Sequence, residues 1–369
     1  MRVVVVGAGM LGASVAYHLA GRKVPVTLVE RAARPGAGVT GDSFAWIGGA
    51  GGHWPGGAAG LRGSVLADWR RLEAELPRVR ARWTGSLRWP PGEDLPEEAW
   101  LSGDSRPEEA WPSGDSRPEE AADGAVVRVG PERIRALEPR LRTPPPSAVH
   151  TPSDGGVDPV AVTEALVRAV PALGGRVLLG ASGVALRVAG GRVTGVATED
   201  GFHPADRVVL AAGTGVNALC APLGISLPVT ASPARLVRLT APPGLVNGIV
   251  AGPDFAVREV APGQLLMTLP EPEKAAAQGS SNPAANPLAL LRAAFTGTGA
   301  CQVVGSRVAD RPVPAGGPLI GPLTSDGSVY VAVAHSAVTL APVIGRLVAA
   351  EIADGRSAEQ LRACRPRLS

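Results

Sequence analysis

The hydrophobic and polar positions at the start of the chain follow the order of a strand, a helix and a second strand. Val3–Val6 form a short, wholly apolar, β-branched run, which is typical of a buried parallel strand. Residues 13–20 then have the pattern of a helix, and a second apolar run, Val26–Val29, ends in Glu30. The chain therefore predicts a βαβ unit at its beginning.

Later segments repeat this mixture of strands and helices. Short strands are predicted at 176–180, 184–188, 192–200 and 207–213, with glycine or acidic turns between them. Helices are predicted at 158–170, where Pro159 takes an early position, and from Leu61 to about Leu76. Near the end, Val329–Ala334 predicts a last strand, followed by a helix from about Thr339 to Ile352. The pattern is that of an α/β protein.

Three glycines at the GxGxxG spacing join the first strand to the first helix. Gly7 allows the tight turn, Gly9 lets the backbone approach a pyrophosphate, and Gly12 lets the helix pack closely on the strand. The helix start offers N–H groups to the phosphates, and Glu30 can accept hydrogen bonds from a ribose. This order predicts a dinucleotide site, with a plain βαβ unit as the alternative. The long glycine-rich stretch at 30–57 favours FAD over NAD.

Composition narrows the class of protein further. The 369 residues are 45% hydrophobic and 19% charged, with a net charge of +3, which describes a globular chain without the basic stripe of a nucleic-acid-binding protein. The three cysteines are widely spaced and make no metal pattern. Glycines break the apolar start, so no signal peptide is expected, and no stretch reaches the length of a membrane span. We expect a cytoplasmic protein.

Five blocks in a fixed order resemble the D-amino acid oxidase / glycine oxidase family of FAD-dependent oxidoreductases. They are the glycine fingerprint with "LVER", "GAGVTGDSFAWIGG" at 36–49, the segment at 154–201, "RVVLAAGTGVNALCAPLGISLPV" at 207–229, and the segment at 310–352 that contains "DRPVPAGGPLIG" and "VYVAVAHSAVTLAPVIG". The resemblance covers most of the chain. It implies a Rossmann-like FAD-binding domain and a second, mostly antiparallel-sheet, substrate-binding domain.

The resemblance also implies how FAD is held, without a covalent bond. It assigns Gly7, Gly9, Met10, Leu11 and Gly12 to the pyrophosphate, Glu30 and Arg31 to the adenosine ribose, the main chain of Val184 to the adenine, Ala212 and Gly213 to the phosphate side, Thr40, Gly41, Ser43, Phe44, Ala45 and Trp46 to the path toward the flavin, and Ser336, Ala337, Val338, Thr339 and Leu340 to the helix start that faces the pyrimidine edge. N–H groups of Val338, Thr339 and Leu340 would stabilise negative charge there. The family usually has more glycine in this last turn.

Four residues are candidates for contact with the substrate. Arg311 in "DRPVPAGGPLIG" would pair with a substrate carboxylate, and its alternative role is a domain-interface salt bridge. Arg258 is a weaker candidate on a strand expected to face the pocket. His53 could enter the pocket or lie in an exposed loop. His335 is expected beside the flavin, as a tentative catalytic residue or as an anchor of its loop.

The expected domain division is discontinuous. Residues 1–85, 150–222 and 306–369 form the FAD-binding domain, and residues 86–149 and 223–305 form the substrate-binding domain. An eleven-residue duplication, "EEAWLSGDSRP" followed by "EEAWPSGDSRP", lies at 97–118 and is expected to be a surface loop, with a lid or a partner-docking element as the alternative. Its prolines and glycines exclude a continuous helix.

The resemblance implies oxidation of a C–N bond of an amino acid or modified amine, by hydride transfer to flavin N5 to give an imine. Oxygen or another electron acceptor would then reoxidise the flavin. The chain has only two tyrosines, Tyr17 and Tyr330, so the substrate pocket departs from family members that use tyrosines. Oxidation of a hydroxy acid, and a non-catalytic FAD-binding subunit of a larger complex, are the alternatives. The oligomeric state stays open.

Overall fold

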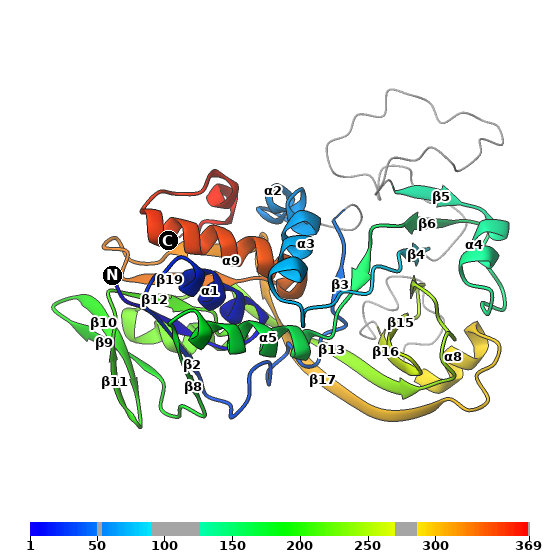
Figure 1. The fold of residues 1–369 in the computed structure, drawn as a ribbon, viewed down its shortest axis with the longest axis horizontal. Coiled ribbons are helices and arrows are strands. Elements are labelled where there is room, and N and C mark those ends of the chain that lie inside the picture. The colour runs from blue at the N-terminus through cyan, green and yellow to red at the C-terminus, as the bar shows by residue number, and fades with distance from the viewer. Residues whose placement is uncertain (50–53, 90–125, 270–285, 368–369) are drawn as a thin grey trace.

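The computed structural model describes residues 1–49, 54–89, 126–269 and 286–367. His53 and the duplicated segment at 97–118 lie outside these residues. Two large sheets lie side by side along the long axis of the molecule, and helices cover one of them (Figure 1). The predicted α/β class is confirmed.

A six-stranded sheet holds the N-terminal βαβ unit at its centre. Its strand order is β18 (Leu319–Pro322), β19 (Val329–Val333), β12 (Arg207–Leu210), β1 (Val3–Val6), β2 (Val26–Glu30) and β8 (Arg176–Leu179). Neighbouring strands are parallel except β18 and β19. Both faces are covered, because Val3 and Val5 belong to one buried cluster while Val4 and Val6 belong to another. This explains the unbroken apolar run in β1.

Helices cover one face of this sheet, and a small sheet packs on the other. Helices α1 (Met10–Gly21), α5 (Pro159–Ala172) and α9 (Ala337–Asp354) share the cluster that contains Val3 and Val5. The opposite cluster includes residues of the three-stranded sheet of β9 (Ala185–Ala189), β10 (Arg192–Thr198) and β11 (Gly201–Pro204). Two short helices, α6 (Val216–Cys220) and the 3₁₀ turn η2 (Gly213–Gly215), follow β12. The four strands predicted between 176 and 213 are present as β8, β9, β10 and β12, but the last ends at Leu210 rather than at 213.

The eight-stranded sheet is the second large element. Its order is β17 (Gln302–Pro314), β13 (Val229–Thr240), β16 (Gln264–Leu269), β15 (Ala256–Ala261), β14 (Ile249–Ala251), β4 (Ser86–Arg88), β6 (Ala148–Thr151) and β5 (Val127–Val129). Only the pair β14 and β4 is parallel among these strands. Helices α4 (Pro131–Leu137) and α8 (Pro287–Ala294) contribute to the buried cluster on one face. The expected mostly antiparallel sheet is therefore present.

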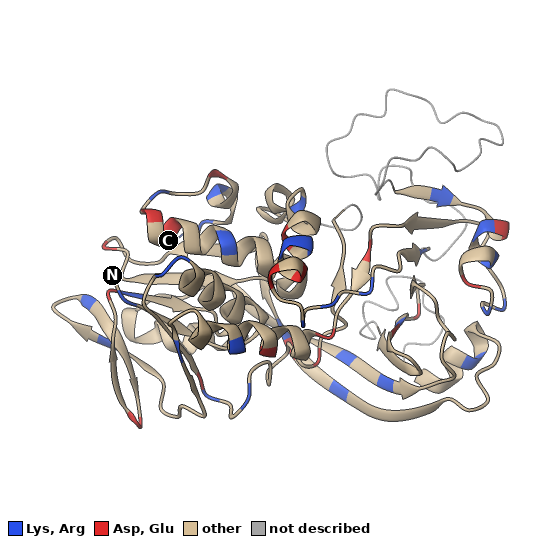
Figure 2. Cartoon of the chain, in the orientation of Figure 1, with Lys and Arg blue, Asp and Glu red and all other residues tan. Residues whose placement is uncertain are grey.

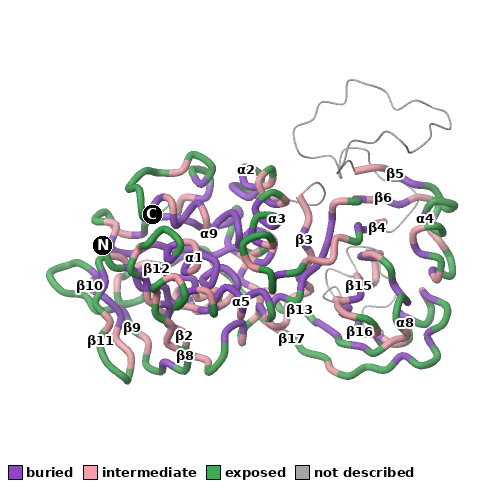
Figure 3. The backbone as a smooth tube through the Cα atoms, in the orientation of Figure 1, coloured by how far each residue is buried: buried purple, intermediate pink, exposed green. Residues whose placement is uncertain are grey.

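The boundaries of the two expected domains do not all coincide with ends of elements. Strand β6 crosses the expected boundary between 149 and 150, and β17 crosses that between 305 and 306. A two-stranded sheet of β3 (Trp46–Ile47) and β7 (Gly155–Gly156) lies between the large sheets (Figure 1). Buried segments concentrate around the six-stranded sheet, whereas the β13–β17 ribbon has long exposed stretches (Figure 3). The domain division itself stays a prediction.

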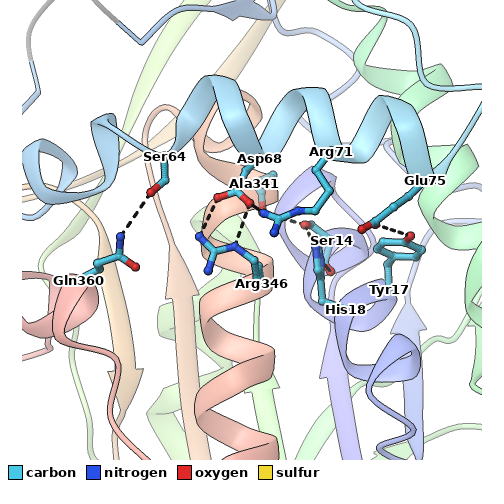
Figure 4. A network of polar contacts seen from close by, with 10 residues as sticks. All are labelled: Ser14, Tyr17, His18, Ser64, Asp68, Arg71, Glu75, Ala341, Arg346 and Gln360. Carbon is cyan, nitrogen blue, oxygen red and sulfur yellow. Dashed lines mark hydrogen bonds and ion pairs between the residues drawn. The ribbon is translucent and has the colours of Figure 1, made fainter.

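The helix expected from Leu61 to about Leu76 is two helices, α2 (Ala58–Arg62) and α3 (Val65–Glu75). The break falls at Gly63 and Ser64, where the chain turns. Helix α3 lies across α1 and α9, and a polar network joins the three (Figure 4). Buried Asp68 accepts two hydrogen bonds from Arg346 of α9, both at 2.8 Å, and also pairs with Arg71. These contacts fix α9, whose first turn is a candidate site element.

Candidate functional site

The glycine turn after β1 has the geometry that close approach of a ligand requires. Gly7 has a φ of +106°, and a Cβ at this position would lie 2.5 Å from the carbonyl oxygen of Ala211. A Cβ at Gly12 would lie 1.9 Å from the carbonyl oxygen of Gly7. Neither position can hold a side chain without moving backbone. The turn therefore brings the N-terminus of α1 close to the end of β12, where Ala212 and Gly213 follow.

Glu30 closes the other side of this turn. Its carboxylate accepts hydrogen bonds from the backbone N–H groups of Ala8, at 2.7 Å, and Ala32, at 2.9 Å. This places an acid beside the glycine turn at the end of β2, as a ribose contact needs. Arg31 is exposed, and Val184 is partly buried just before β9. The turn, the helix start and Glu30 together fit a dinucleotide.

The segment 40–46 starts at the glycine turn and ends at the two-stranded sheet. Thr40 accepts a hydrogen bond from the N–H of Met10 at 3.2 Å, and Gly9 lies close enough that a Cβ there would be 3.2 Å from the same hydroxyl. Ala45 has a φ of +53°, in the left-handed region that costs about 1–2 kcal/mol for a residue with a Cβ. Such strain persists only where surrounding contacts fix the backbone.

The first turn of α9 lies against the end of this segment. The Thr339 hydroxyl donates to the carbonyl oxygen of Trp46 at 2.7 Å, and the indole N–H of buried Trp69 donates to the carbonyl oxygen of Thr339 at 2.9 Å. The helix begins at Ala337, so its first-turn N–H groups are those of Ala337, Val338 and Thr339. The N–H of Leu340 instead donates to Ser336 at 3.0 Å, which corrects the expectation of an available donor there.

His335 lies in the turn between β19 and α9, and its side chain is exposed. The turn leads directly into the first turn of α9. The contact of that turn of α9 with the segment 40–46 is made by Thr339, four residues further on. Its role stays a prediction.

Several arginines lie on one face of the eight-stranded sheet, among them Arg88, Arg238, Arg258, Arg307 and Arg311. Strand register puts directly paired residues, and residues two apart on a strand, on the same face. Two rows of directly paired residues cross the strands on this face. One row is Arg88, Ala251, Ala256, Thr268, Leu236 and Arg307, and the next is Arg258, Leu266 and Arg238. Further along the same face, Ser232 pairs with Arg311. Basic positions recur along the β13–β17 ribbon in Figure 2.

This face looks toward the segment 40–46. The Arg238 side chain donates to the carbonyl oxygen of Gly41 at 2.6 Å, and the Arg307 guanidinium lies 3.9 Å from the carboxylate of Asp42. The Arg88 guanidinium lies 4.8 Å from the ring centroid of Trp46. The sheet therefore contacts the segment along most of its length.

Arg258 has a different role from the one expected. Its side chain is only 2% exposed, and it donates to the carbonyl oxygens of Phe44, at 2.8 Å, and Val157, at 2.6 Å. Burial lowers the pKa of the guanidinium to about 10, so it remains a cation at neutral pH. The expectation that Arg258 faces a substrate pocket is corrected, because its guanidinium is engaged with the backbone on both sides of the two-stranded sheet.

Arg311 lies on the same face, two rows beyond Arg307 on β17. It is partly buried, and its Nη2 donates to the hydroxyl of Ser232 at 3.4 Å. A partly exposed guanidinium on the face that contacts the segment 40–46 can present a fork of donors to a carboxylate. The assignment of Arg311 to a substrate stays a prediction.

Two neighbours of Trp46 were not identified from the sequence. Asp154, which is 1% exposed, accepts hydrogen bonds from the Trp46 indole N–H at 2.9 Å and from the Ser86 hydroxyl at 2.7 Å. Burial raises the pKa of Asp154, although both hydrogen bonds and nearby Arg88 oppose the shift. Arg88 and Asp154 are far apart in the chain, and only strand pairing brings them to one indole.

A cavity of about 380 Å³ lies at the start of the same segment. Gly41, Ser43, Asp158, Arg238 and Gln264 are among the residues that line it. Its size is at the lower end of the range for small-molecule sites.

In the part of the chain that the structure describes, no group of three or more His, Cys, Asp or Glu side chains could hold a metal. None of the described helices has both the length and the apolar character needed to cross a bilayer.

A family model described as FAD dependent oxidoreductase (DAO) matches residues 2–351. A D-amino acid dehydrogenase of Cereibacter sphaeroides is 61% identical over 44 residues, which are 12% of this chain and 10% of that protein. A 4-methylaminobutanoate oxidase (formaldehyde-forming) of Paenarthrobacter nicotinovorans is 26% identical over 63% of this chain and 27% of that protein. The chain therefore matches well under half the length of these curated relatives.

The crystal structure of glycine oxidase from Geobacillus kaustophilus has a similar fold. It is 20% identical, with a TM-score of 0.80, over 99% of this chain and 98% of that chain. At this identity the likeness concerns the fold. The likeness extends over both large sheets, so the two proteins share the arrangement of these sheets.

Proposed function

Because the chain belongs to the DAO family of FAD-dependent oxidoreductases, we propose that it oxidises a C–N bond of an amino acid or modified amine. FAD would be held without a covalent bond, by the glycine turn, Glu30, the segment 40–46 and the first turn of α9. When bound, FAD supplies the acceptor for the hydride of the substrate C–H bond, and an imine is left for water to hydrolyse. Oxygen or another electron acceptor completes the turnover.

The observation that carries this proposal is the position of Arg311. It lies on the sheet face that contacts the segment 40–46, opposite Ser232 in the strand register. A planar guanidinium can hold a carboxylate bidentately and so fix the α-carbon of an amino acid relative to the cofactor. The protein would then act mainly by orienting a neutral amine, without a strong general base.

The first turn of α9 supports the same function. Its N–H groups and the positive end of the helix dipole favour negative charge close to the turn. Thr339 and Trp69 hold this turn against Trp46 through hydrogen bonds at 2.7 and 2.9 Å. A fixed set of donors can stabilise charge that develops during reduction.

The experiment that tests the proposal begins with purified protein reconstituted with FAD. A flavin absorption spectrum that survives gel filtration, and is lost on acid precipitation, is expected for non-covalent FAD. Protein that retains no flavin would refute the proposal.

Anaerobic reduction then separates the possible substrates. Holoenzyme is mixed with a panel of amino acids and N-alkylated amines, and separately with hydroxy acids, while flavin absorbance is followed. Bleaching by an amine is the expected result. Bleaching only by hydroxy acids would move the oxidised bond to C–OH, and bleaching by neither panel would favour a non-catalytic subunit.

A further inference from the structure

Four arginines contact the segment 41–46 almost residue by residue. Arg238 donates to Gly41, Arg307 pairs with Asp42, Arg258 donates to Phe44, and Arg88 covers the Trp46 ring. They come from four strands, β13, β17, β15 and β4, of the eight-stranded sheet.

The strongest contacts surround the strained residue of the segment. Ala45 has a φ of +53°, and its carbonyl oxygen accepts a hydrogen bond from Val157 at 3.2 Å. Arg258 donates to the carbonyl oxygens on both sides of this pairing, those of Phe44 and Val157. A cation that donates to two carbonyls can offset the cost of the left-handed conformation, because hydrogen bonds from charged groups are worth about 1.5–3 kcal/mol each.

The aromatic side chains are held in the same way. The Arg258 guanidinium lies 5.4 Å from the ring centroid of Phe44, and Phe44 meets Trp46 edge to face with centroids 6.4 Å apart. Arg88 lies over the far ring, 4.8 Å from the Trp46 centroid. Arg258, Phe44, Trp46 and Arg88 thus form one continuous row of contacts across the sheet face.

We propose that Arg88, Arg238, Arg258 and Arg307 form an arginine clasp that holds the backbone of 41–46 in the conformation that accepts FAD. They are positioning residues, distinct from Arg311, and the inference rests on the proposed function. The clasp makes cofactor binding depend on the eight-stranded sheet, although the glycine turn belongs to the six-stranded one. It also places positive charge along the segment 41–46, with Arg258 buried, and this charge favours added negative charge on reduction.

The test compares Arg258→Met and Arg258→Lys with a matched control, Arg235→Met. Arg235 is exposed on β13, one residue out of register with the clasp face, and its Nε donates to Ser306 at 3.0 Å. Each protein is first checked for cooperative thermal unfolding without FAD. The dissociation constant for FAD is then measured by quenching of flavin fluorescence, and the midpoint potential of the bound flavin by anaerobic dye titration.

Arg258→Met should raise the FAD dissociation constant about tenfold or more, the scale of losing a charged hydrogen bond. Its flavin potential should also fall, whereas Arg258→Lys should keep the potential near the wild-type value and recover part of the affinity. Arg235→Met should change neither quantity. A folded Arg258→Met protein with wild-type affinity and potential would overturn the clasp.

If Arg258→Met does not fold, Arg238→Met replaces it. Arg238 is exposed, and its hydrogen bond to the segment is the one from Nη2 to the carbonyl oxygen of Gly41. Weaker FAD binding with unchanged thermal unfolding is expected, and unchanged binding overturns the clasp. If wild-type protein binds FAD and the arginine variants bind it with the same dissociation constant, only the clasp is refuted. Wild-type protein that binds no FAD refutes both the clasp and the proposed function.

Discussion

Acidification from about pH 7 to about pH 4 should destabilise the native protein through His18 of α1. The ring is partly buried under α3, and its Nδ1 lies 2.8 Å from the carbonyl oxygen of Ser14, to which it donates (Figure 4). Burial lowers the pKa of His18 to about 4. The hydrogen bond to Ser14 and the carboxylate of Glu75 oppose this shift, whereas Arg71 and Arg346 reinforce it.

The sign and size of the change in the free energy of unfolding follow from the difference in the pKa of His18 between the native and unfolded states. An unfolded histidine has a pKa of about 6.5, so below that pH the unfolded chain takes up a proton that native His18 refuses. Stability therefore falls as the pH drops from about 6.5 to about 4 and levels off below. A full shift of that size corresponds to roughly 3 kcal/mol, and partial exposure of the ring reduces it to about 2–3 kcal/mol.

The assay is urea unfolding of protein without FAD, followed by tryptophan fluorescence, because Trp69 is fully buried in the same layer. Wild-type protein is compared at each pH with His18→Asn, which keeps a donor near Nδ1 and cannot be protonated. The difference between the two free energies of unfolding isolates His18 from all other titrating groups. It should change by about 2–3 kcal/mol in the stated window. A difference that stays constant with pH would refute the argument that burial keeps His18 neutral.

Three further substitutions test the site and its support. Arg311→Lys should raise KM for an amino acid substrate about tenfold or more with FAD affinity unchanged, because an ammonium loses the bidentate contact; steady-state kinetics showing an unchanged KM would argue against a carboxylate contact. His335→Ala should keep FAD bound and slow reduction or reoxidation by about tenfold, measured by stopped-flow absorbance, and unchanged rates in both half-reactions would leave it an anchor of its loop. Gly345→Ala should lower stability by about 1–3 kcal/mol in thermal unfolding, since the new Cβ would lie 2.2 Å from the Ser14 hydroxyl; an unchanged melting temperature would contradict this tight packing of α1 on α9.

Local signals in the sequence were sufficient for the nucleotide end of the molecule. The run Val3–Val6, the spacing of Gly7, Gly9 and Gly12, and Glu30 after the next strand each depend on neighbouring residues only. Their geometry in the structure is the expected one, with Gly7 at a φ of +106°. The apolar pattern does not fix the first residue of a helix: α9 begins at Ala337, whereas the sequence predicts a start at about Thr339. One extra half-turn changed which N–H groups the helix presents.

Tertiary structure alone decided what the arginines do. In the sequence, Arg311 was the stronger and Arg258 the weaker candidate for contact with the substrate, and each is next to an acidic residue, Asp310 or Glu259. The direction of each side chain depends on the register of strands that are distant in the chain, as in the pairing of Ser232 with Arg311. Burial also distinguishes the two residues, because Arg258 is buried and donates to the carbonyl oxygens of Phe44 and Val157, whereas Arg311 is only partly buried. The sequence determined which cofactor-binding turn forms, and the sheet register determined which charged groups surround it.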